Sequence, residues 1–119
     1  MTDRELLELA AKAAGIKVDW RKSVECFCYS SSPYNVAWSP LNDDGDALRL
    51  AVKLGISLTP YPIYRSDARH AVVAKQRRSG DTLREMNPTE CLEPYDEDPY
   101  AATRRAIVRA AAEIGNEMP

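Results

Sequence analysis

The sequence predicts an α+β fold in which an antiparallel or mixed β-sheet packs with three helices. Apolar residues recur at helical spacing in residues 3–14, 44–54 and 99–114, and they alternate with polar residues in the segments between. Because helices do not alternate with single strands, a doubly wound parallel sheet is disfavoured. The 119 residues, 45% of them hydrophobic, fit one domain spanning residues 1–119. We therefore expect a layered helix–sheet–helix sandwich.

The first helix is marked at both ends. Thr2 and Glu5 have the spacing of a capping box, in which each side chain bonds the backbone amide of the other residue. Gly15 stands where a left-handed residue commonly ends a helix. These signals predict a helix over residues 3–14.

Period-two alternation of apolar and polar residues follows the first helix. It predicts strands over residues 16–20 and 24–29, joined by a polar turn. The segment 34–38 is expected to form a third short strand before Pro40.

The second helix is predicted over residues 44–54. Asn42 or Asp43 can cap it, and Leu48, Ala51 and Val52 mark an apolar face. The acidic residues at its start suit the positive end of a helix dipole, which explains them better than a divalent cation site does.

The segment after the second helix is less regular and rich in proline. Residues 56–58 alternate like a strand, and Pro60 and Pro62 restrict that strand to the edge of a sheet. Residues 70–76 and 82–86 are predicted to form a hairpin around a polar turn.

The last helix has the strongest start signal in the chain. Asp98 is an acidic cap, and Pro99 occupies the first helical position, where proline is favoured. An apolar face follows, and Gly115 is expected to end the helix. The helix is therefore predicted over residues 99–114.

The cysteines and the single histidine are the residues from which a reactive or metal centre could be built. Cys26 and Cys28 share a strand face, and a metal site would also need Cys91 and His70. Such a site would use every Cys and His in the chain, so we interpret the sulfurs as small core residues and expect no metal and no cofactor. A small enzyme using His70 with a cysteine or a carboxylate is the least favoured function, and no catalytic residue is assigned.

Charge and aromatic residues favour a binding function. The net charge of −2 disfavours a globally basic nucleic-acid binder. Tyr61 and Tyr64, in the proline-rich segment, are candidate contacts with a partner. Arg104, Arg105 and Arg109 form a basic stripe on the last helix, which could meet an acidic partner or a phosphate backbone.

Three motifs carry a resemblance to a known family. They are the W-x-P-L motif of residues 38–41, the D-x-D-A motif of residues 44–47, and DPYAATRRAI at 98–107. With them the chain resembles small phage and prophage proteins of the phage ABA-sandwich family and, more distantly, NinX proteins. The likeness covers about two thirds of the chain, and residues 60–92 depart from it. It implies a layered helix–sheet–helix domain made in an infected or lysogenic bacterium, and it supplies no catalytic residues.

These observations together predict a phage or prophage accessory protein that acts without catalysis. The expected partner is a host or phage protein, with a nucleic-acid-associated regulator as the alternative. Homodimerisation through a strand edge or a helix face is a further hypothesis. No segment has the length of a membrane span, and the polar start at residues 1–5 differs from a secretory signal, so we expect the bacterial cytoplasm and no membrane partner.

Overall fold

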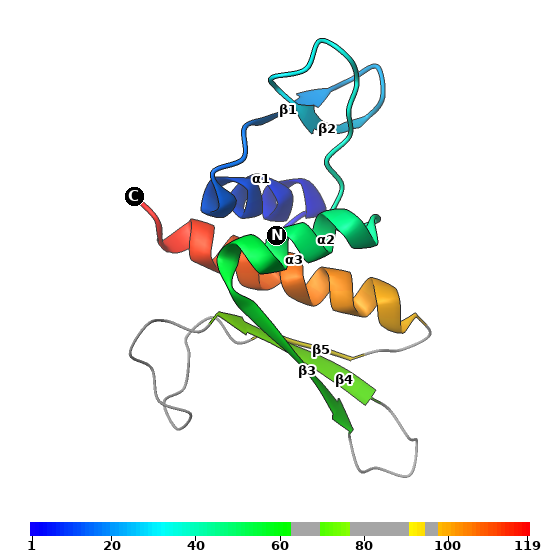
Figure 1. Ribbon diagram of the computed structural model, residues 1–119, viewed down its shortest axis with the longest axis vertical. Coiled ribbons are helices and arrows are strands. Elements are labelled where there is room, and N and C mark those ends of the chain that lie inside the picture. Colours follow the sequence, from blue (N-terminus) through cyan, green and yellow to red (C-terminus); the bar gives the residue numbers. More distant parts are fainter. Residues whose placement is uncertain (63–69, 77–90, 95–97) are drawn as a thin grey trace.

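The computed structural model describes residues 1–62, 70–76, 91–94 and 98–119. Within these ranges, residues 59–62, 70–76 and 91–94 are described by their backbone alone. Three helices occupy the middle of the molecule, with a two-stranded antiparallel sheet on one side and a three-stranded antiparallel sheet on the other (Figure 1). The α+β class, the three helices and the antiparallel pairing are confirmed. The layering follows the expected sandwich only loosely, because the described strands form two sheets.

Helix α1, Asp3–Ala14, begins and ends where the sequence predicts. The Thr2 hydroxyl oxygen accepts a hydrogen bond from the Glu5 amide at 3.2 Å, and the Glu5 carboxylate accepts one from the Thr2 amide at 3.1 Å. Gly15 has a φ of 68°, a left-handed conformation that glycine adopts without a steric penalty. The local signals alone therefore fix this helix.

Strands β1, Val18–Arg21, and β2, Cys26–Tyr29, pair as an antiparallel hairpin. The predicted third strand over residues 34–38 is wrong as a full strand, since a single bridge joins Ala37 to Cys28. Two further backbone hydrogen bonds flank that bridge, from the Tyr29 amide to the Val36 carbonyl and from the Trp38 amide to the Phe27 carbonyl. This segment occupies the free edge of β2, and so β2 cannot extend the second sheet.

Helix α2, Asp44–Leu54, has the predicted bounds, with Asp43 as its cap. The expected apolar face is only partly right. Ala51 is buried, whereas Leu48 is 61% exposed and Val52 is 73% exposed. The buried stripe instead contains Leu50, which is 1% exposed. The helix carries two apolar stripes, and the one that includes small alanines allows the closer approach to the neighbouring helix.

The second sheet consists of β3, Ile56–Pro62, β4, His70–Gln76, and β5, Cys91–Pro94, in that spatial order. Strand β3 lies at the edge, as its prolines predict. Strand β4 is confirmed, and it pairs with both β3 and β5. Residues 82–86, the predicted partner of β4, lie outside the described residues. The sequence did not predict β5.

Helix α3, Pro99–Glu117, is capped by Asp98, whose carboxylate accepts from the Tyr100 and Ala101 amides. The prediction that Gly115 ends this helix is wrong, because the helix continues for two further residues. A Cβ on Gly115 would overlap the carbonyl oxygen of Leu9 in α1. The glycine therefore permits close contact between two helices, and it does not terminate one.

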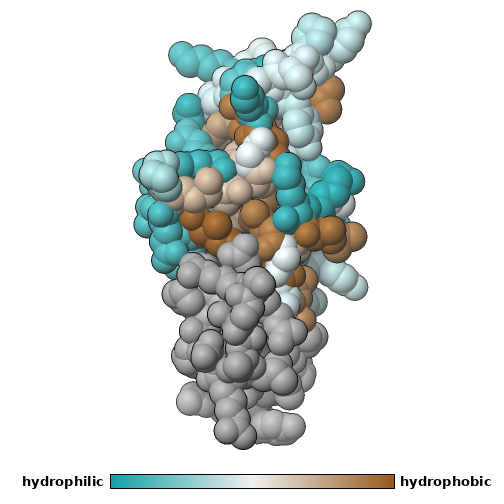
Figure 2. Space-filling view, turned by 60° about the vertical axis from the view of Figure 1, so that its left-hand side comes forward, coloured by the Kyte–Doolittle hydropathy of each residue, from teal (hydrophilic) through white to brown (hydrophobic). Residues whose placement is uncertain are grey.

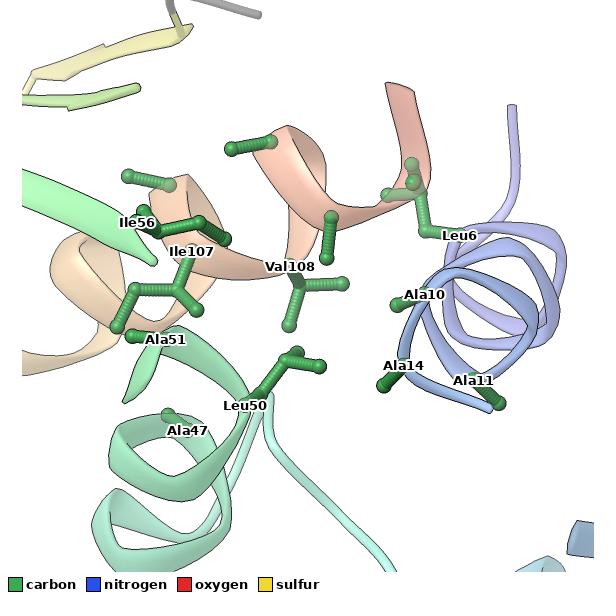
Figure 3. Close-up of a cluster of buried hydrophobic side chains, with 14 of the residues drawn as sticks. Leu6, Ala10, Ala11, Ala14, Ala47, Leu50, Ala51, Ile56, Ile107 and Val108 are labelled. Atoms are coloured by element: carbon green, nitrogen blue, oxygen red, sulfur yellow. The ribbon is translucent and has the colours of Figure 1, made fainter. Parts of the chain in front are cut away.

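The core lies between the helices and is rich in alanine (Figure 3). Helices α1 and α3 pack most extensively, and α3 also contacts α2, β4 and β5. Because α3 has neighbours on both sides, it is buried around much of its circumference, as at Ala106, Val108 and Ala112. The core also includes Phe27 of the hairpin and Trp38, which is 2% exposed. Trp38 thus anchors the segment that links the hairpin to α2.

Candidate functional site

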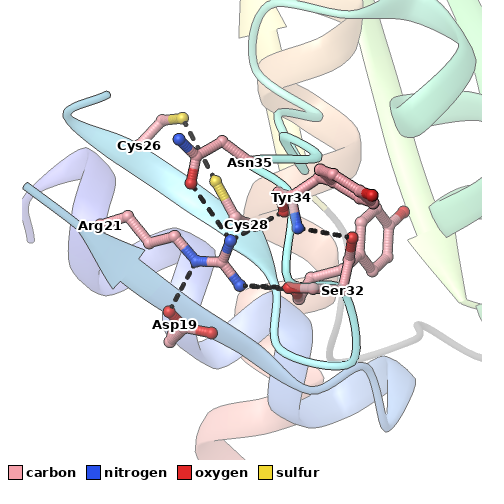
Figure 4. Close-up of polar contacts among 8 residues, drawn as sticks. Asp19, Arg21, Cys26, Cys28, Ser32, Tyr34 and Asn35 are labelled. Carbon is pink, nitrogen blue, oxygen red and sulfur yellow. Dashed lines mark hydrogen bonds and ion pairs between the residues drawn. The ribbon is translucent and has the colours of Figure 1, made fainter. Parts of the chain in front are cut away.

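A loop of residues 30–35, which we call the tyrosine loop, is held in place by one side chain, Arg21 of β1 (Figure 4). The Arg21 Nε donates to Asp19 Oδ2 at 3.0 Å, and Nη1 donates to Asn35 Oδ1 at 3.2 Å. The two Nη atoms also donate to three backbone carbonyl oxygens, at 2.8, 3.0 and 2.9 Å, those of Tyr34, Tyr29 and Ser32. The planar guanidinium carries five donors in a fixed fork, so a single side chain fixes the path of this loop.

The charges of Asp19 and Arg21 strengthen the hydrogen bond between these two side chains. The hydrogen bond from Arg21 lowers the pKa of Asp19, and a second hydrogen bond from Ser30 acts in the same direction. Asp19 in turn raises the pKa of the Arg21 guanidinium, chiefly through that hydrogen bond. Both groups are therefore charged at neutral pH, and the bond between them is charge-assisted.

The tyrosine loop presents an aromatic side chain to solvent. Tyr34 is 77% exposed, and Val36 just beyond the loop is 47% exposed. The Tyr34 amide donates to the Ser32 hydroxyl oxygen at 3.1 Å, which restrains the backbone that carries the ring. In Figure 2 the hairpin end of the molecule is mostly pale, the colour of intermediate hydropathy, and hydrophobic atoms gather nearer the middle. An aromatic ring on an ordered, weakly polar loop is a typical contact element.

Helix α2 carries a second exposed apolar group. Leu48 and Val52 are one turn apart, and both lie on the solvent side of the helix. The neighbouring Arg49 donates a hydrogen bond to Asp46 at 2.6 Å, and this bond raises the pKa of Arg49. Leu48 and Val52 include no aromatic ring, and no ordered loop carries them. The tyrosine loop is therefore the better candidate for a partner contact.

The predicted basic stripe on α3 is largely engaged by the chain itself. The Arg104 side chain is 17% exposed, and it donates to the Leu41 carbonyl at 2.8 Å and to Asp44 at 2.6 Å. Arg105 is 42% exposed and pairs with Asp3 at 3.1 Å. Arg109 is half-buried and lines a hollow of about 250 Å³ between α1 and α3. Arg104 thus joins α3 to the start of α2.

The two tyrosines predicted as contacts fall where side chains are not described. Tyr61 lies in β3, where its backbone pairs with Ala71 of β4. Tyr64 lies outside the described residues. Both remain predictions.

The structure does not bring together the four residues considered for a metal site. Cys26 and Cys28 lie in the hairpin, with their Sγ atoms 3.9 Å apart. His70 and Cys91 lie in β4 and β5, on the other side of the helices (Figure 1). Within the described ranges, no three His, Cys, Asp or Glu residues are grouped as metal ligands.

The acidic residues at the start of α2 have structural contacts of their own. Asp43 Oδ2 accepts from the Asp46 amide at 2.8 Å, and the two Asp46 carboxylate oxygens accept from the Ser39 amide and from Arg49. Asp44 holds Arg104. These contacts tie the W-x-P segment and α3 to one helix end, which agrees with the structural interpretation of the cluster.

An open groove of about 480 Å³ lies between α1 and β1. The Arg4 guanidinium lies 4.4 Å from the ring centre of Trp20, and Trp20 meets Phe27 edge to face at 5.2 Å. Lys12 and Glu8 are also in the lining, so both signs of charge are present. This mixed lining favours no ligand of a single charge. We interpret the aromatic contacts as the packing that holds the hairpin against α1.

Sequence reasoning missed both the tyrosine loop and its support. Tyr34 stands next to Pro33 in a break between apolar segments, a composition that marks an exposed loop. Arg21 gave no signal, because three of its acceptors are backbone carbonyls. Because every residue has a backbone carbonyl, the residue types do not show which carbonyls accept these bonds.

No family model matches the chain. No curated protein and no solved structure has a significant match to it either. Among the helices that the structure describes, none combines the length and the apolar character required to cross a membrane.

Proposed function

We propose that this chain is a phage or prophage accessory protein that binds another protein through the tyrosine loop, in the bacterial cytoplasm and without a catalytic step. The observation that carries the proposal is Tyr34, which is 77% exposed on a loop that accepts three of the five hydrogen bonds from Arg21, at Ser32, Tyr34 and Asn35. The phage origin rests on the W-x-P and Asp-Pro motifs of the sequence.

An ordered loop favours binding because less conformational entropy is lost when a partner docks. Immobilising one flexible side chain at an interface costs about 0.5–1.5 kcal/mol, and ordering a loop backbone adds to that cost. Here the chain's own Arg21 has already ordered the loop. Tyrosine also has few rotatable bonds and combines a broad apolar ring with a polar hydroxyl. The partner we infer therefore offers an apolar pocket with a hydrogen-bonding group at its base.

The nucleic-acid alternative has weaker support. Arg104 and Arg105 already contact Asp44 and Asp3, so phosphate binding would have to compete with carboxylates of the same chain. The net charge of −2 adds no long-range attraction for a polyanion. A gel-shift measurement at low salt tests this alternative, and a shift at micromolar protein would favour it over protein binding.

The binding proposal is tested by affinity capture from the encoding bacterium, followed by titration of the recovered partner. Tyr34→Ala removes the ring from the loop. Tyr100→Ala is the matched control, because Tyr100 is 71% exposed at the start of α3, away from the hairpin. A central interface tyrosine contributes about 2 kcal/mol or more, so Tyr34→Ala should weaken binding by roughly 30-fold, and Tyr100→Ala should leave it unchanged.

Two results would contradict the proposal. One is a partner that binds Tyr34→Ala as tightly as the unmodified chain. The other is loss of binding in Leu48→Ser or Val52→Ser alone, which would place the interface on α2. The phage origin is tested separately by the genes that neighbour this one, since a consistent location outside prophage regions would contradict it.

A further inference from the structure

Cys26 and Cys28 form a pair of thiols on one face of β2. Their Sγ atoms lie 3.9 Å apart, and neither sulfur is in a disulfide (Figure 4). The strand that carries them is paired on both sides. Arg21 and Asp19 of β1 oppose the two cysteines in register, and Ala37 bridges to Cys28 from the other edge. The spacing of the sulfurs is therefore set by a backbone that is held in place before any ligand arrives.

This spacing suits two sulfurs that share one central atom. With bonds of about 2.3 Å to one central atom, two sulfurs can lie at most about 4.6 Å apart, whatever the angle between the bonds. The observed 3.9 Å lies within that limit. A disulfide bond would require the sulfurs to close to about 2.05 Å, which the paired strand resists. The geometry thus fits bridging of the two thiols better than their oxidation.

The surroundings of the pair determine which sulfur a ligand reaches first and in which protonation state. Cys28 is 0% exposed, and Cys26 is partly exposed, so an incoming ion meets the Cys26 sulfur first. Arg21 of β1 opposes Cys26, and its positive charge lowers the pKa of Cys26 against the larger effect of burial. Burial raises the pKa of the Cys26 thiol, so Cys26 carries its proton at neutral pH until a ligand displaces it.

The number of ligands selects the class of ion. A structural zinc ion takes four protein ligands, and within the described residues nothing extends this pair to three. Thiolates select soft ions, and some soft centres are satisfied by two sulfurs. We propose that Cys26 and Cys28 together bind one soft, thiophilic metal or metalloid centre of the class that includes Cu(I) and trivalent arsenic. This site is independent of the tyrosine loop's proposed partner.

Phenylarsine oxide is a suitable probe, because its trivalent arsenic takes two thiols. Two S–H bonds break, two As–S bonds form, and the arsenic-bound oxygen leaves as water with both protons. The native chain is treated with the probe, washed with excess monothiol to remove singly bound arsenic, and weighed intact by mass spectrometry. We expect one arsenical per chain.

The variants make the assignment specific. Cys26→Ser and Cys28→Ser should each lose the adduct, and Cys91→Ser, which alters the cysteine of β5, should keep it. Cys26 is partly exposed, so Cys26→Ser decides the question even if Cys28→Ser fails to fold. Two results would overturn the proposal: no adduct on the native chain, or an adduct that survives Cys26→Ser in folded protein.

Discussion

Replacing Gly115 by alanine tests whether the close contact between α1 and α3 organises the core. A Cβ at this position would overlap the Leu9 carbonyl oxygen and lie 2.8 Å from the Leu9 carbonyl carbon. Both atoms belong to the backbone of α1, so no side chain can rotate away to make room. The two helices would have to separate along the most extensive contact in the molecule.

The size of the effect follows from two opposing terms. Alanine is favoured over glycine inside a helix by about 1 kcal/mol. Overpacking a well-filled core costs about 1–3 kcal/mol, and a clash with backbone belongs at or above the upper end of that range. We therefore expect Gly115→Ala to lower the free energy of unfolding by about 2 kcal/mol. With an unfolding entropy of about 2.1 cal/mol/K per residue, this loss lowers the unfolding temperature of a chain this long by about 8 °C.

Thermal unfolding followed by circular dichroism measures this effect, and Gly45→Ala provides the control. A Cβ on Gly45 would lie 3.3 Å from the ends of the Arg49 and Asp43 side chains, which would need to shift by only a few tenths of an ångström. The control should therefore leave the unfolding temperature unchanged or raise it slightly. If Gly115→Ala is as stable as Gly45→Ala, the helices do not approach as closely as the structure indicates, and the argument for Gly115 fails.

Four further predictions concern the other contacts. Arg21→Lys replaces the fork by a single ammonium, so amide hydrogen exchange in residues 30–35 should accelerate while α1 is unaffected. Because the pKa of Asp19 is lowered in the folded chain, Asp19 contributes its full stabilisation above the ordinary aspartate pKa. That stabilisation is lost as the pH falls through the lowered pKa, and the same hydrogen-exchange experiment in acid should detect the loss. Arg104→Ala should cost about 1–3 kcal/mol in denaturant unfolding, because it leaves the Leu41 carbonyl without this bond. Asp98→Ala removes the cap of α3 and should cost about 1 kcal/mol in the same assay, and an unchanged midpoint would contradict the capping role.

The starts of all three helices and the ends of α1 and α2 were predictable because their causes are local. Thr2 and Glu5 satisfy each other's backbone donors, and Asp43 and Asp98 cap their own helices. Each of these interactions spans only a few residues, so the residue types at fixed spacing carry the information. The same holds for Gly55, which ends α2 with a φ of 65°.

The choice of buried face and the role of Gly115 were not predictable, because they depend on neighbours distant in sequence. Helix α2 has two apolar stripes, and only the approach of α3 determines that Leu50 is buried and Leu48 exposed. A glycine late in a helix has the same sequence pattern whether it ends the helix or admits another backbone. The contact with Leu9, more than a hundred positions away, decides between the two.

The candidate site was also not predictable, because it too depends on contacts between residues distant in sequence. The sequence offered arginines and tyrosines in abundance, and it favoured those on α3 and in the proline-rich segment. Arg104 shows that residue type alone does not separate a binding arginine from a structural one, since an arginine near a carboxylate and a carbonyl forms an internal contact. Arg21 makes the corresponding contacts in the hairpin, and there they hold a loop whose tyrosine still faces solvent.

The position of the tyrosine loop separates binding from folding. The hairpin sits on α1 through Trp20, Phe27 and Arg4, and Trp38 fixes the end of the linking segment in the core. Tyr34 contributes to neither contact, being largely exposed. Substitutions at the ring should therefore alter partner affinity at nearly constant unfolding temperature, whereas substitutions at Trp38 should lower the unfolding temperature first. A Tyr34→Ala variant that unfolds well below the unmodified chain would show that the ring stabilises the hairpin, and it would remove the reason for assigning Tyr34 to a partner.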